Sequence, residues 1–417
     1  MARIVLATFG SLGDLHPVLA LAQELRQRGH AATIATSELY REKISALGFG
    51  FAALRPEISV MDEALVQRIM DGSRGTEVLL RELIIPAVRE MHADLARVTA
   101  GADLLVTSEL VYAAPLLAEQ TGLRWVSYAL APLSYFSIHD PCVPPVSIAG
   151  EWMHRLPPSL VQASNRLAQW FTNAWWRPVR EFRRELGLPP GGNPIFAGKH
   201  SPRLDLALFS PVLQPPQADW PASTVQCGFC FYDEAAARVT LPPPVEEFLA
   251  AGEPPIVFTL GSAAVFAAEN FYPESARATQ QLGRPALLLL GNNPPPDSLP
   301  PSILAWDYLP FAQIFPHAAA VVHQGGVGTT AQALRAGRPM LVMPFGFDQP
   351  DNAARVTRLG VGRTVPRSRY TADRVAHEIA ALFAAPAINS TATALASRLR
   401  AERGPAAACD ALEAQLR

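Results

Sequence analysis

Lysine is nearly absent from this chain. Lys43 and Lys199 are the only two lysines among 35 basic residues, so almost all of the positive charge is carried by arginine. With 37 acidic residues the formal net charge is −2. A balance of this kind creates no strong positive field, so the sequence does not predict nucleic acid as a partner. We attribute the arginine bias to the base composition of the genome.

Long apolar runs are also missing. No run reaches the roughly 18 apolar residues that a membrane-spanning helix needs. The first ten residues, MARIVLATFG, have the pattern of a buried strand that ends in glycine, and they lack the features of a secretory signal. The sequence therefore predicts no membrane span, and we expect a cytoplasmic protein.

Cysteine is scarce as well. Four cysteines are too few for a disulfide framework in 417 residues. Cys227 and Cys230 form one C-x-x-C, without a second pair or a nearby histidine. Because a structural zinc ion needs four ligands, we favour two ordinary strand or loop cysteines over a metal site. No metal and no cofactor are expected.

The remaining composition is that of a folded globular protein, with 49% hydrophobic and 17% charged residues. A single core rarely exceeds roughly 250–300 residues, so two domains are expected. Apolar runs alternate with helical spacing in both halves, which predicts parallel sheets covered by helices on both faces. The predicted strands are residues 4–8, 32–36, 104–107 and 125–127, then 256–260, 286–290, 319–323 and 340–343.

The middle of the chain differs from both halves. Residues 132–158 are rich in proline and aromatic residues without a clear period, and residues 160–186 have the pattern of one long helix. The proline density after residue 210 favours an extended linker. We assign residues 1–215 to a first domain, 216–244 to a linker and 245–395 to a second domain. Residues 396–417 are expected to form a helix that packs back on the first domain.

The most informative segment is HQGGVGTTAQALRAGRPMLVMPFGFDQPDNA, residues 323–353. It predicts a strand that ends at His323, a glycine-rich turn and then a helix. Gly325, Gly326 and Gly328 allow the backbone to approach a ligand closely. The helix start offers unpaired N–H groups and a partial positive charge, which suit a diphosphate, and the His323 side chain would add a hydrogen bond.

This segment resembles the signature of bacterial family 1 glycosyltransferases with the GT-B fold, which reads H-x-G-G-x-G-T-T, then Pro-Phe and Asp-Gln. The group includes sterol, antibiotic and rhamnosyltransferases, and the resemblance covers essentially the whole chain. It implies two doubly wound, Rossmann-like domains that face each other across a cleft. The second would bind a nucleotide-sugar donor and the first a small apolar acceptor. It implies diphosphate contacts from His323, Gly328 and Thr329, with Gly325 and Gly326 as further donor-binding residues of the same turn.

The resemblance also implies contacts to the other parts of the donor. Asp348 and Gln349 match the acid–amide pair that holds sugar hydroxyls, although Asp348 also stands where a helix from Pro350 would be capped. Ser262, in the loop after the first strand of the second domain, would reach toward phosphate. Tyr308 would stack on the base and the Leu309 backbone would pair with its edge, with core packing as the alternative for Tyr308.

One departure from the pattern concerns the ribose. Plant members have a glutamate eight residues after the signature histidine, where this chain has Ala331. A thymidine nucleotide lacks the 2′-hydroxyl that this glutamate binds. The departure therefore favours a dTDP-sugar over a UDP-sugar, although bacterial enzymes that use UDP-sugars also lack it.

The first loop, FGSLGDLHP, supplies the candidates for catalysis. The resemblance places it opposite the donor, with Gly13 near the donor and Asp14 where plant members have their catalytic histidine. Inverting transfer needs a base that takes the proton of the acceptor hydroxyl. We expect Asp14 to be this base, with His16 as the second candidate because its usual pKa lies nearer neutrality. Capping of the helix near Pro17 is the alternative for both.

Aromatic residues of the first domain are the candidates for acceptor binding, since ligand pockets are mostly apolar. They are Tyr135, Phe136, Trp152 and Trp170, with core packing as the alternative for each. The stretch around Tyr135 resembles rhamnosyltransferases that act on flavonoids or hydroxyacyl lipids, so rhamnose or glucose is the expected sugar.

Two other functions remain possible from the sequence. Nucleotide-sugar epimerases share the two-domain architecture, and a non-catalytic binder of nucleotide sugars would keep the donor turn. We favour an inverting glycosyltransferase without a metal ion, because the chain has no D-x-D pair and because a binder would not need Asp14. The sequence makes no prediction of the oligomeric state.

Overall fold

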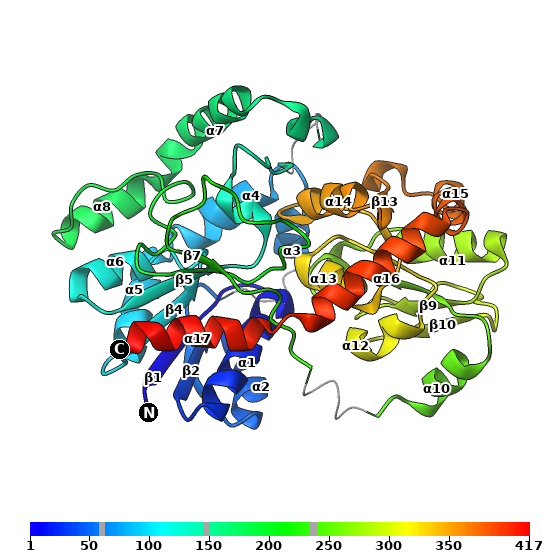
Figure 1. The fold of residues 1–417 in the computed structure, drawn as a ribbon, viewed down its shortest axis with the longest axis horizontal. Helices are drawn as coiled ribbons and strands as arrows, with labels where there is room; N and C mark the ends of the chain where they lie inside the picture. The colour runs from blue at the N-terminus through cyan, green and yellow to red at the C-terminus, as the bar shows by residue number, and fades with distance from the viewer. Residues whose placement is uncertain (58–62, 145–149, 234–239) are drawn as a thin grey trace.

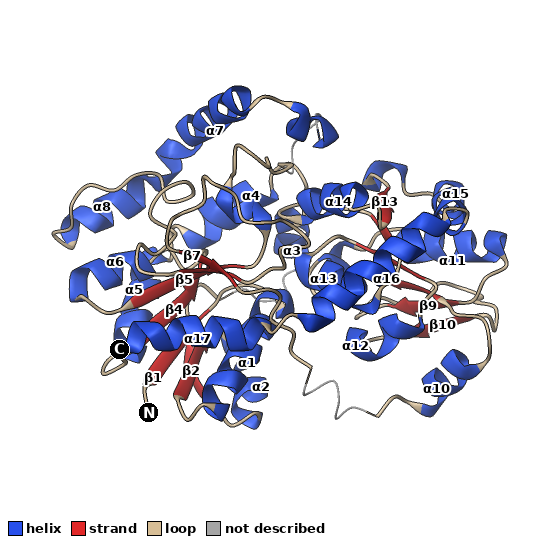
Figure 2. Cartoon of the chain, in the orientation of Figure 1, coloured by secondary structure: helices blue, strands red, loops and turns tan. Residues whose placement is uncertain are grey.

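The computed structural model describes residues 1–57, 63–144, 150–233 and 240–417. It contains two parallel sheets, each flanked by helices, in the two halves of the chain (Figures 1 and 2). The prediction of two doubly wound α/β domains is therefore confirmed.

The first sheet has seven parallel strands in the order β3-β2-β1-β4-β5-β6-β7. Successive side chains of a strand alternate between its faces, so Ile4 and Leu6 join one core cluster while Val5 and Ala7 join the other. The strands are β1 (Arg3–Ala7), β2 (Ala31–Thr36), β3 (Gly50–Ala53), β4 (Leu104–Ser108), β5 (Trp125–Ala129), β6 (Asp205–Ala207) and β7 (Thr224–Gln226).

The second sheet has six parallel strands in the order β10-β9-β8-β11-β12-β13. In both sheets the order reverses beside the first strand, and ligands of such sheets bind where this reversal occurs, at the carboxyl ends of the strands. The strands are β8 (Ile256–Thr259), β9 (Ala286–Leu289), β10 (Ile303–Trp306), β11 (Ala320–His323), β12 (Met340–Val342) and β13 (Gly362–Thr364).

The connecting helices cover both faces of each sheet. Those of the first half are α1 (Leu12–Gln27), α2 (Arg41–Ala46), α3 (Glu63–Ile69), α4 (Gly75–Val78), α5 (Val88–Val98), α6 (Ala114–Thr121), α7 (Pro158–Thr172) and α8 (Arg177–Glu185). Those of the second half are α10 (Pro243–Ala250), α11 (Phe271–Leu282), α12 (Phe311–Ile314), α13 (Val327–Ala336), α14 (Gln349–Arg358), α15 (Ala372–Phe383), α16 (Pro386–Ala401) and α17 (Gly404–Leu416).

Two sequence predictions need correction. The expected helix over residues 160–186 is broken into α7 and α8 by a 3-10 turn at Asn173–Trp176. Pro178, in the first turn of α8, explains the break because proline cannot donate the hydrogen bond that a continuous helix needs. The expected linker at 216–244 contains β7, which pairs with β6 and so extends the first sheet.

Apolar and ionic contacts join the two halves. Val66 and Ile69 of the first half lie in a core cluster with Phe258 of the second. Asp140, which follows β5, pairs with Arg355 (2.6 Å) and Arg358 (2.7 Å) of α14. Arg355 is only 1% exposed, so this ion pair is shielded from solvent and fixes the loop after β5 against the second domain.

The chain ends by crossing between the halves. Helix α16 packs on α13 of the second domain, whereas α17 packs on α1 of the first. Cys409 and Leu412 of α17 are buried in the same cluster as Leu21. Arg28 pairs with Asp410 of α17 (2.6 Å) and anchors it at the surface. Figure 1 shows α17 lying along the first domain and the carboxyl end near β1.

Within the described residues, no single helix has the length and apolarity to cross a membrane. The segments Ala372–Phe383 and Pro386–Leu416 together have the length and composition of a membrane span, but the chain bends by 73° between them.

Candidate active site

The first loop holds Asp14 in a capping box at the start of α1. The Ser11 N–H donates to Oδ2 of Asp14 (2.8 Å), and the Gly13 N–H donates to Oγ of Ser11 (3.2 Å). The Ser11 hydroxyl also lies 3.4 Å from Oδ2. A Cβ at Gly10, which has φ +138°, would stand 2.2 Å from the same oxygen, so only glycine fits beside the carboxylate. Asp14 is therefore part of the helix cap, and the hydrogen bonds of this cap orient its carboxylate through one oxygen, Oδ2.

The electrostatic environment changes the acidity of Asp14. Burial raises the pKa of its carboxyl group to about 7, and the hydrogen bonds from Ser11 act against this rise. The negative charge of Asp348, from the second domain, raises the pKa of Asp14 further. A carboxylate with a pKa near 7 is a far stronger base than an ordinary aspartate, and it titrates near the pH at which an enzyme works.

His16 lies on another side of α1. Two residues along a helix turn by about 200°, so His16 and Asp14 do not share a face. Its Nε2 lies 3.3 Å from Nζ of Lys43, and its ring centroid lies 5.4 Å from that of Tyr232. Burial and the charge of Lys43 lower the pKa of His16 to about 4. The structure thus separates the two residues that the sequence proposed as alternative bases.

The turn after β11 fixes the protonation of His323. The Gly325 N–H donates to Nδ1 of His323 (3.0 Å), so the proton of the neutral ring is on Nε2. Burial lowers the pKa of His323 to about 3, which keeps the ring neutral. Within the described part of the chain, Nε2 is buried and has no hydrogen-bond partner. An unmade hydrogen bond of this kind is costly, which identifies Nε2–H as a donor available to a ligand.

Asp348 reaches the start of α13. Its Oδ2 accepts from the Val327 N–H (3.2 Å), the first helical residue, and from Nδ2 of Asn352 (2.7 Å). Although Asp348 is the N-cap residue of α14, its side chain makes no cap hydrogen bond there. Burial raises the pKa of Asp348 to about 6. This carboxylate therefore lies at the positive end of α13, beside the exposed Gly328 and the buried Thr329.

Gln349 and Gly326 complete this turn. Oε1 of Gln349 accepts from the Phe345 N–H (2.9 Å), and the side chain is buried. This bond fixes the amide group and leaves its NH₂ as the donor that can serve a ligand. Gly326 is the N-cap of α13, and its carbonyl accepts from the Thr330 N–H (2.9 Å).

The loop after β8 packs against the same turn. Gly261 has φ +66°, and a Cβ there would stand 2.3 Å from Nε2 of Gln324. The loop therefore brings the partly exposed Ser262 to the residues that follow His323. Tyr308 is 60% exposed, which excludes core packing for it, whereas Leu309 is buried.

The four aromatic residues expected to bind the acceptor are not brought together. The Tyr135 ring stacks between Trp220 (4.3 Å between centroids) and His200 (5.0 Å), and its hydroxyl donates to Oδ2 of Asp205 (2.8 Å). Both ring faces are covered by these neighbours, so the structure places Tyr135 in packing, which was the alternative given for it. Phe136, the next residue, packs on Phe196, with 4.9 Å between the ring centroids.

The two tryptophans are on the surface instead. Trp152 and Trp170 are 63% and 68% exposed. Trp170 lies on α7 and contacts Phe171 (5.0 Å between centroids), while Trp152 is paired with Arg155. Their exposure shows that neither tryptophan is part of the packed core, which was the alternative given for both.

Two positioning residues were missed in the sequence. Ser11 and Asp14 have the spacing of a capping box, S-x-x-D, which would have identified Ser11. Asn352 stands four residues after Asp348 on α14, and this spacing brings side chains together on a helix. Its Nδ2 also donates to the Gly325 carbonyl (2.9 Å), so it ties α14 to the glycine turn.

The two cysteines of the C-x-x-C motif are buried among apolar side chains of the first domain. Burial raises the pKa of Cys227 to about 12. In the described ranges, no three histidine, cysteine, aspartate or glutamate side chains are grouped so that they could hold a metal ion.

Two doubly wound domains, with the glycine turn before α13 in one and the Asp14 loop in the other, form the architecture of the GT-B class of transferases. Family models agree with this. Residues 4–124 match the glycosyltransferase family 28 N-terminal domain. Residues 289–415 match the C-terminal domain of proteins like erythromycin biosynthesis protein CIII.

Comparisons over the full length lead to the same class. The chain is 33% identical to O-mycaminosyltylonolide 6-deoxyallosyltransferase of Streptomyces fradiae, over 99% of this chain and 97% of that protein. The glycosyltransferase of kitacinnamycin has a similar structure, with a TM-score of 0.75 and 22% identity over 100% of this chain and 99% of that one. Spinosyn rhamnosyltransferase SpnG in complex with thymidine diphosphate has a TM-score of 0.67 and 18% identity. This similarity covers 99% of this chain and 100% of that one.

This chain belongs to the family 1 nucleotide-sugar-dependent glycosyltransferases, and its fold is GT-B. The comparisons do not favour the epimerase alternative, because these relatives are glycosyltransferases.

Proposed function

We propose that this glycosyltransferase inverts the anomeric centre and needs no metal ion. It transfers a 6-deoxyhexose such as rhamnose, with glucose as the alternative, from a dTDP- or UDP-sugar to a hydroxyl of a small apolar acceptor. The observation that carries the proposal is the buried Nε2–H of His323, which has no hydrogen-bond partner among the described residues and lies at the turn that leads into α13.

The leaving diphosphate is bound by donors of the second domain. Nε2–H of His323 and the N–H groups of Gly328 and Thr329 converge on the anion, and the dipole of α13 adds positive potential. Ser262 adds a hydroxyl from the loop after β8. Hydrogen-bond donors fixed before the reaction stabilise developing charge efficiently, which is the role that a metal ion has in other transferases.

The acceptor is activated from the first domain. As the acceptor oxygen bonds to the anomeric carbon, its proton moves to Asp14 and the bond to the diphosphate breaks, with the electron pair leaving on the phosphate oxygen. Single displacement inverts the anomeric configuration. The pKa of about 7 makes Asp14 a suitable base, and the hydrogen bonds from Ser11 direct the carboxylate through Oδ2.

Several residues hold the rest of the donor. Asp348 and the amide of Gln349 bind sugar hydroxyls, Gly13 approaches the donor from the first loop, and Gly325 and Gly326 let the backbone come close. The exposed Tyr308 ring stacks on the base, and the Leu309 backbone pairs with its edge. The thymidine diphosphate bound to SpnG supports the choice of dTDP, as does Ala331 in this chain.

The test is product analysis with purified protein. A dTDP-sugar and a UDP-sugar are each incubated alone, with a flavonol, with a hydroxyacyl lipid and with O-mycaminosyltylonolide, the acceptor named for the Streptomyces relative. A glycosylated acceptor of inverted configuration, formed only when donor and acceptor are both present, supports the proposal. A changed sugar nucleotide without acceptor indicates an epimerase, and nucleotide binding without any product indicates a binder.

A further inference from the structure

Helix α7 presents its apolar side chains to solvent. Only Val161 of its 15 residues is buried. Four large apolar side chains, which we call the α7 apolar face, are more than half exposed. They are Leu160 (54%), Leu167 (55%), Trp170 (68%) and Phe171 (63%). Figure 1 shows α7 at the edge of the first domain, with no other element beyond it.

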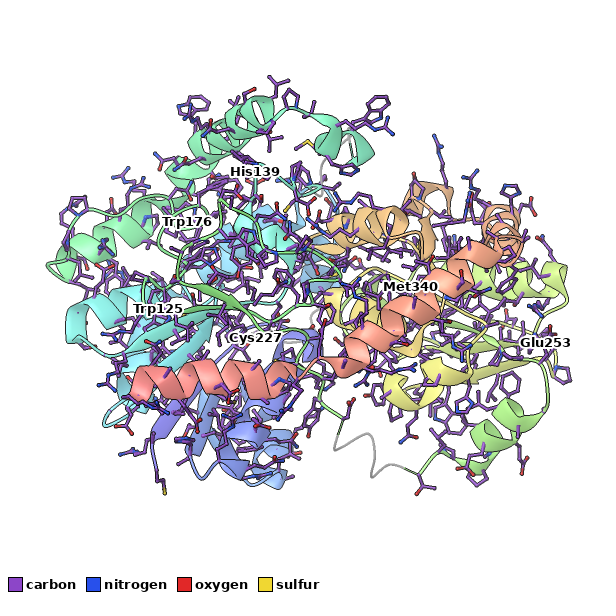
Figure 3. All side chains as sticks on the ribbon, viewed as in Figure 1. Trp125, His139, Trp176, Cys227, Glu253 and Met340 are labelled. Carbon is purple, nitrogen blue, oxygen red and sulfur yellow. The ribbon has the colours of Figure 1, made fainter. Side chains whose placement is uncertain are left out.

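The inner side of α7 is attached by polar contacts. Nδ2 of Asn165 donates to the Phe136 carbonyl (3.0 Å), and Nδ2 of Asn193 donates to the Gln169 carbonyl (3.1 Å) and to Oγ1 of Thr172 (2.8 Å). An ordinary surface helix does the opposite, because it packs its apolar stripe on the core and exposes its polar side. Figure 3 shows the side chains of α7 projecting from the edge of the molecule. The arrangement leaves an apolar surface that a partner can cover.

The segment that carries this face is rich in arginine, although Glu181 follows it and pairs with Arg177 (2.7 Å). Residues 152–180 contain no aspartate or glutamate, and they include Arg155, Arg166, Arg177 and Arg180, in a chain whose net charge is −2. Arg166 stands one helical turn before Trp170, and Arg155 lies over the exposed Trp152 ring (5.0 Å). Arginine beside tryptophan, phenylalanine and leucine is the composition of helices that lie in the surface of an anionic membrane.

We propose that α7 and the turn before it dock the first domain on an anionic lipid bilayer. The α7 apolar face enters the boundary between headgroups and acyl chains, and Arg155 and Arg166 contact lipid phosphates. A second copy of the chain suits the surface less well, since a symmetric pair would bring arginines of both copies together. The helix lies on the membrane and does not cross it. The inference is independent of the reaction proposed above.

The test is co-sedimentation of the full chain with vesicles. Vesicles of phosphatidylcholine mixed with phosphatidylglycerol are expected to bind it at low salt, and pure phosphatidylcholine to bind it weakly. The variant Leu167→Ser/Trp170→Ser/Phe171→Ser should bind at least about tenfold less. Arg155→Gln/Arg166→Gln should weaken binding to the anionic vesicles at least about threefold and reduce its salt dependence.

Matched controls separate this surface from general stickiness. Leu39→Ser removes an exposed leucine (52%) elsewhere on the first domain, and Arg203→Gln removes an exposed arginine. Both should bind as the unchanged protein does. If the triple variant fails to fold, the single variant Trp170→Ser takes its place in the vesicle-binding test.

Three results would overturn the inference. They are an absence of binding to either vesicle type, equal binding by the α7 variant and Leu39→Ser, and an oligomer in gel filtration that the α7 variant dissociates. The last result would assign this face to a second copy of the chain.

Discussion

Asp14 and Asp348 come from different domains, and the negative charge of Asp348 raises the pKa of Asp14. Each residue lies at the N-terminus of a helix: Asp14 is in the first turn of α1, and Asp348 is the N-cap residue of α14. Hydrogen bonds from Ser11 orient one, and those from Val327 and Asn352 orient the other. An acceptor base and a sugar-binding carboxylate placed in this way would enclose the anomeric centre between them.

The first prediction concerns the pH profile. Because Asp14 acts as a base only when ionised, kcat/KM should rise with pH and level off above about 7. Asp348→Asn removes a negative charge that raises the pKa of Asp14, so the rising limb should move at least about half a unit lower. Initial rates at subsaturating acceptor give the profile. If the rising limb of the pH profile lay at the same pH in Asp348→Asn as in the unchanged protein, the charge of Asp348 would not affect the pKa of Asp14.

The second prediction concerns stability. The pKa of Asp14 is about 7 in the folded protein against 3.8 in an ordinary aspartate, so the folded state binds more protons between these values. Its stability therefore falls as the pH rises from about 4 to 7. Asp14→Asn should raise the free energy of unfolding by about 2 kcal/mol at pH 8, after allowance for partial exposure, and by little at pH 4. Urea unfolding at the two pH values measures this, and an equal gain at both would contradict it.

The third prediction separates the two candidate bases. Asp14→Asn should lower kcat about 10²–10⁴-fold, the usual contribution of a positioned base. His16→Gln should lower it less than about threefold, because His16 contacts Lys43 and lies on another face of α1. The same donor and acceptor are used for both variants. A larger loss in His16→Gln than in Asp14→Asn would make His16 the base.

The fourth prediction concerns the leaving group. His323→Ala removes the buried Nε2–H donor and should lower kcat about 10²–10³-fold. It should also reduce the rise in melting temperature that dTDP produces, since a ligand stabilises the fold in proportion to its binding. His317→Ala, on the same domain but outside the glycine turn, is the control. Equal thermal shifts in all three proteins would place the nucleotide elsewhere.

Much of the fold could be read from apolar spacing. The runs that became β1, β4, β8 and β11 were recognised because buried parallel strands are continuous and apolar. Strands β3, β6 and β7 were not, since they begin at Gly50, Asp205 and Thr224 instead of forming continuous apolar runs, and they depend on pairing with a neighbour. Helices α16 and α17 begin at Pro386 and Gly404-Pro405, in agreement with the preference of proline for the first turn of a helix.

The candidate site was predictable in part. The glycine turn after His323 is encoded locally, because backbone conformation and helix start depend on neighbouring residues. The contact of His16 with Lys43 was not predictable in this way, because the two residues are 27 positions apart. The stacking of Tyr135 on Trp220, and the exposure of Trp170, depend on contacts between distant segments, which composition does not reveal.

The central claim is that protein donors alone stabilise the departing diphosphate. The most direct measurement is the rate of transfer by protein treated with a chelator and assayed in metal-free buffer. We predict a rate equal to that of untreated protein, and no increase when magnesium or manganese is added. A complete loss of turnover that only a divalent cation restores would contradict the account.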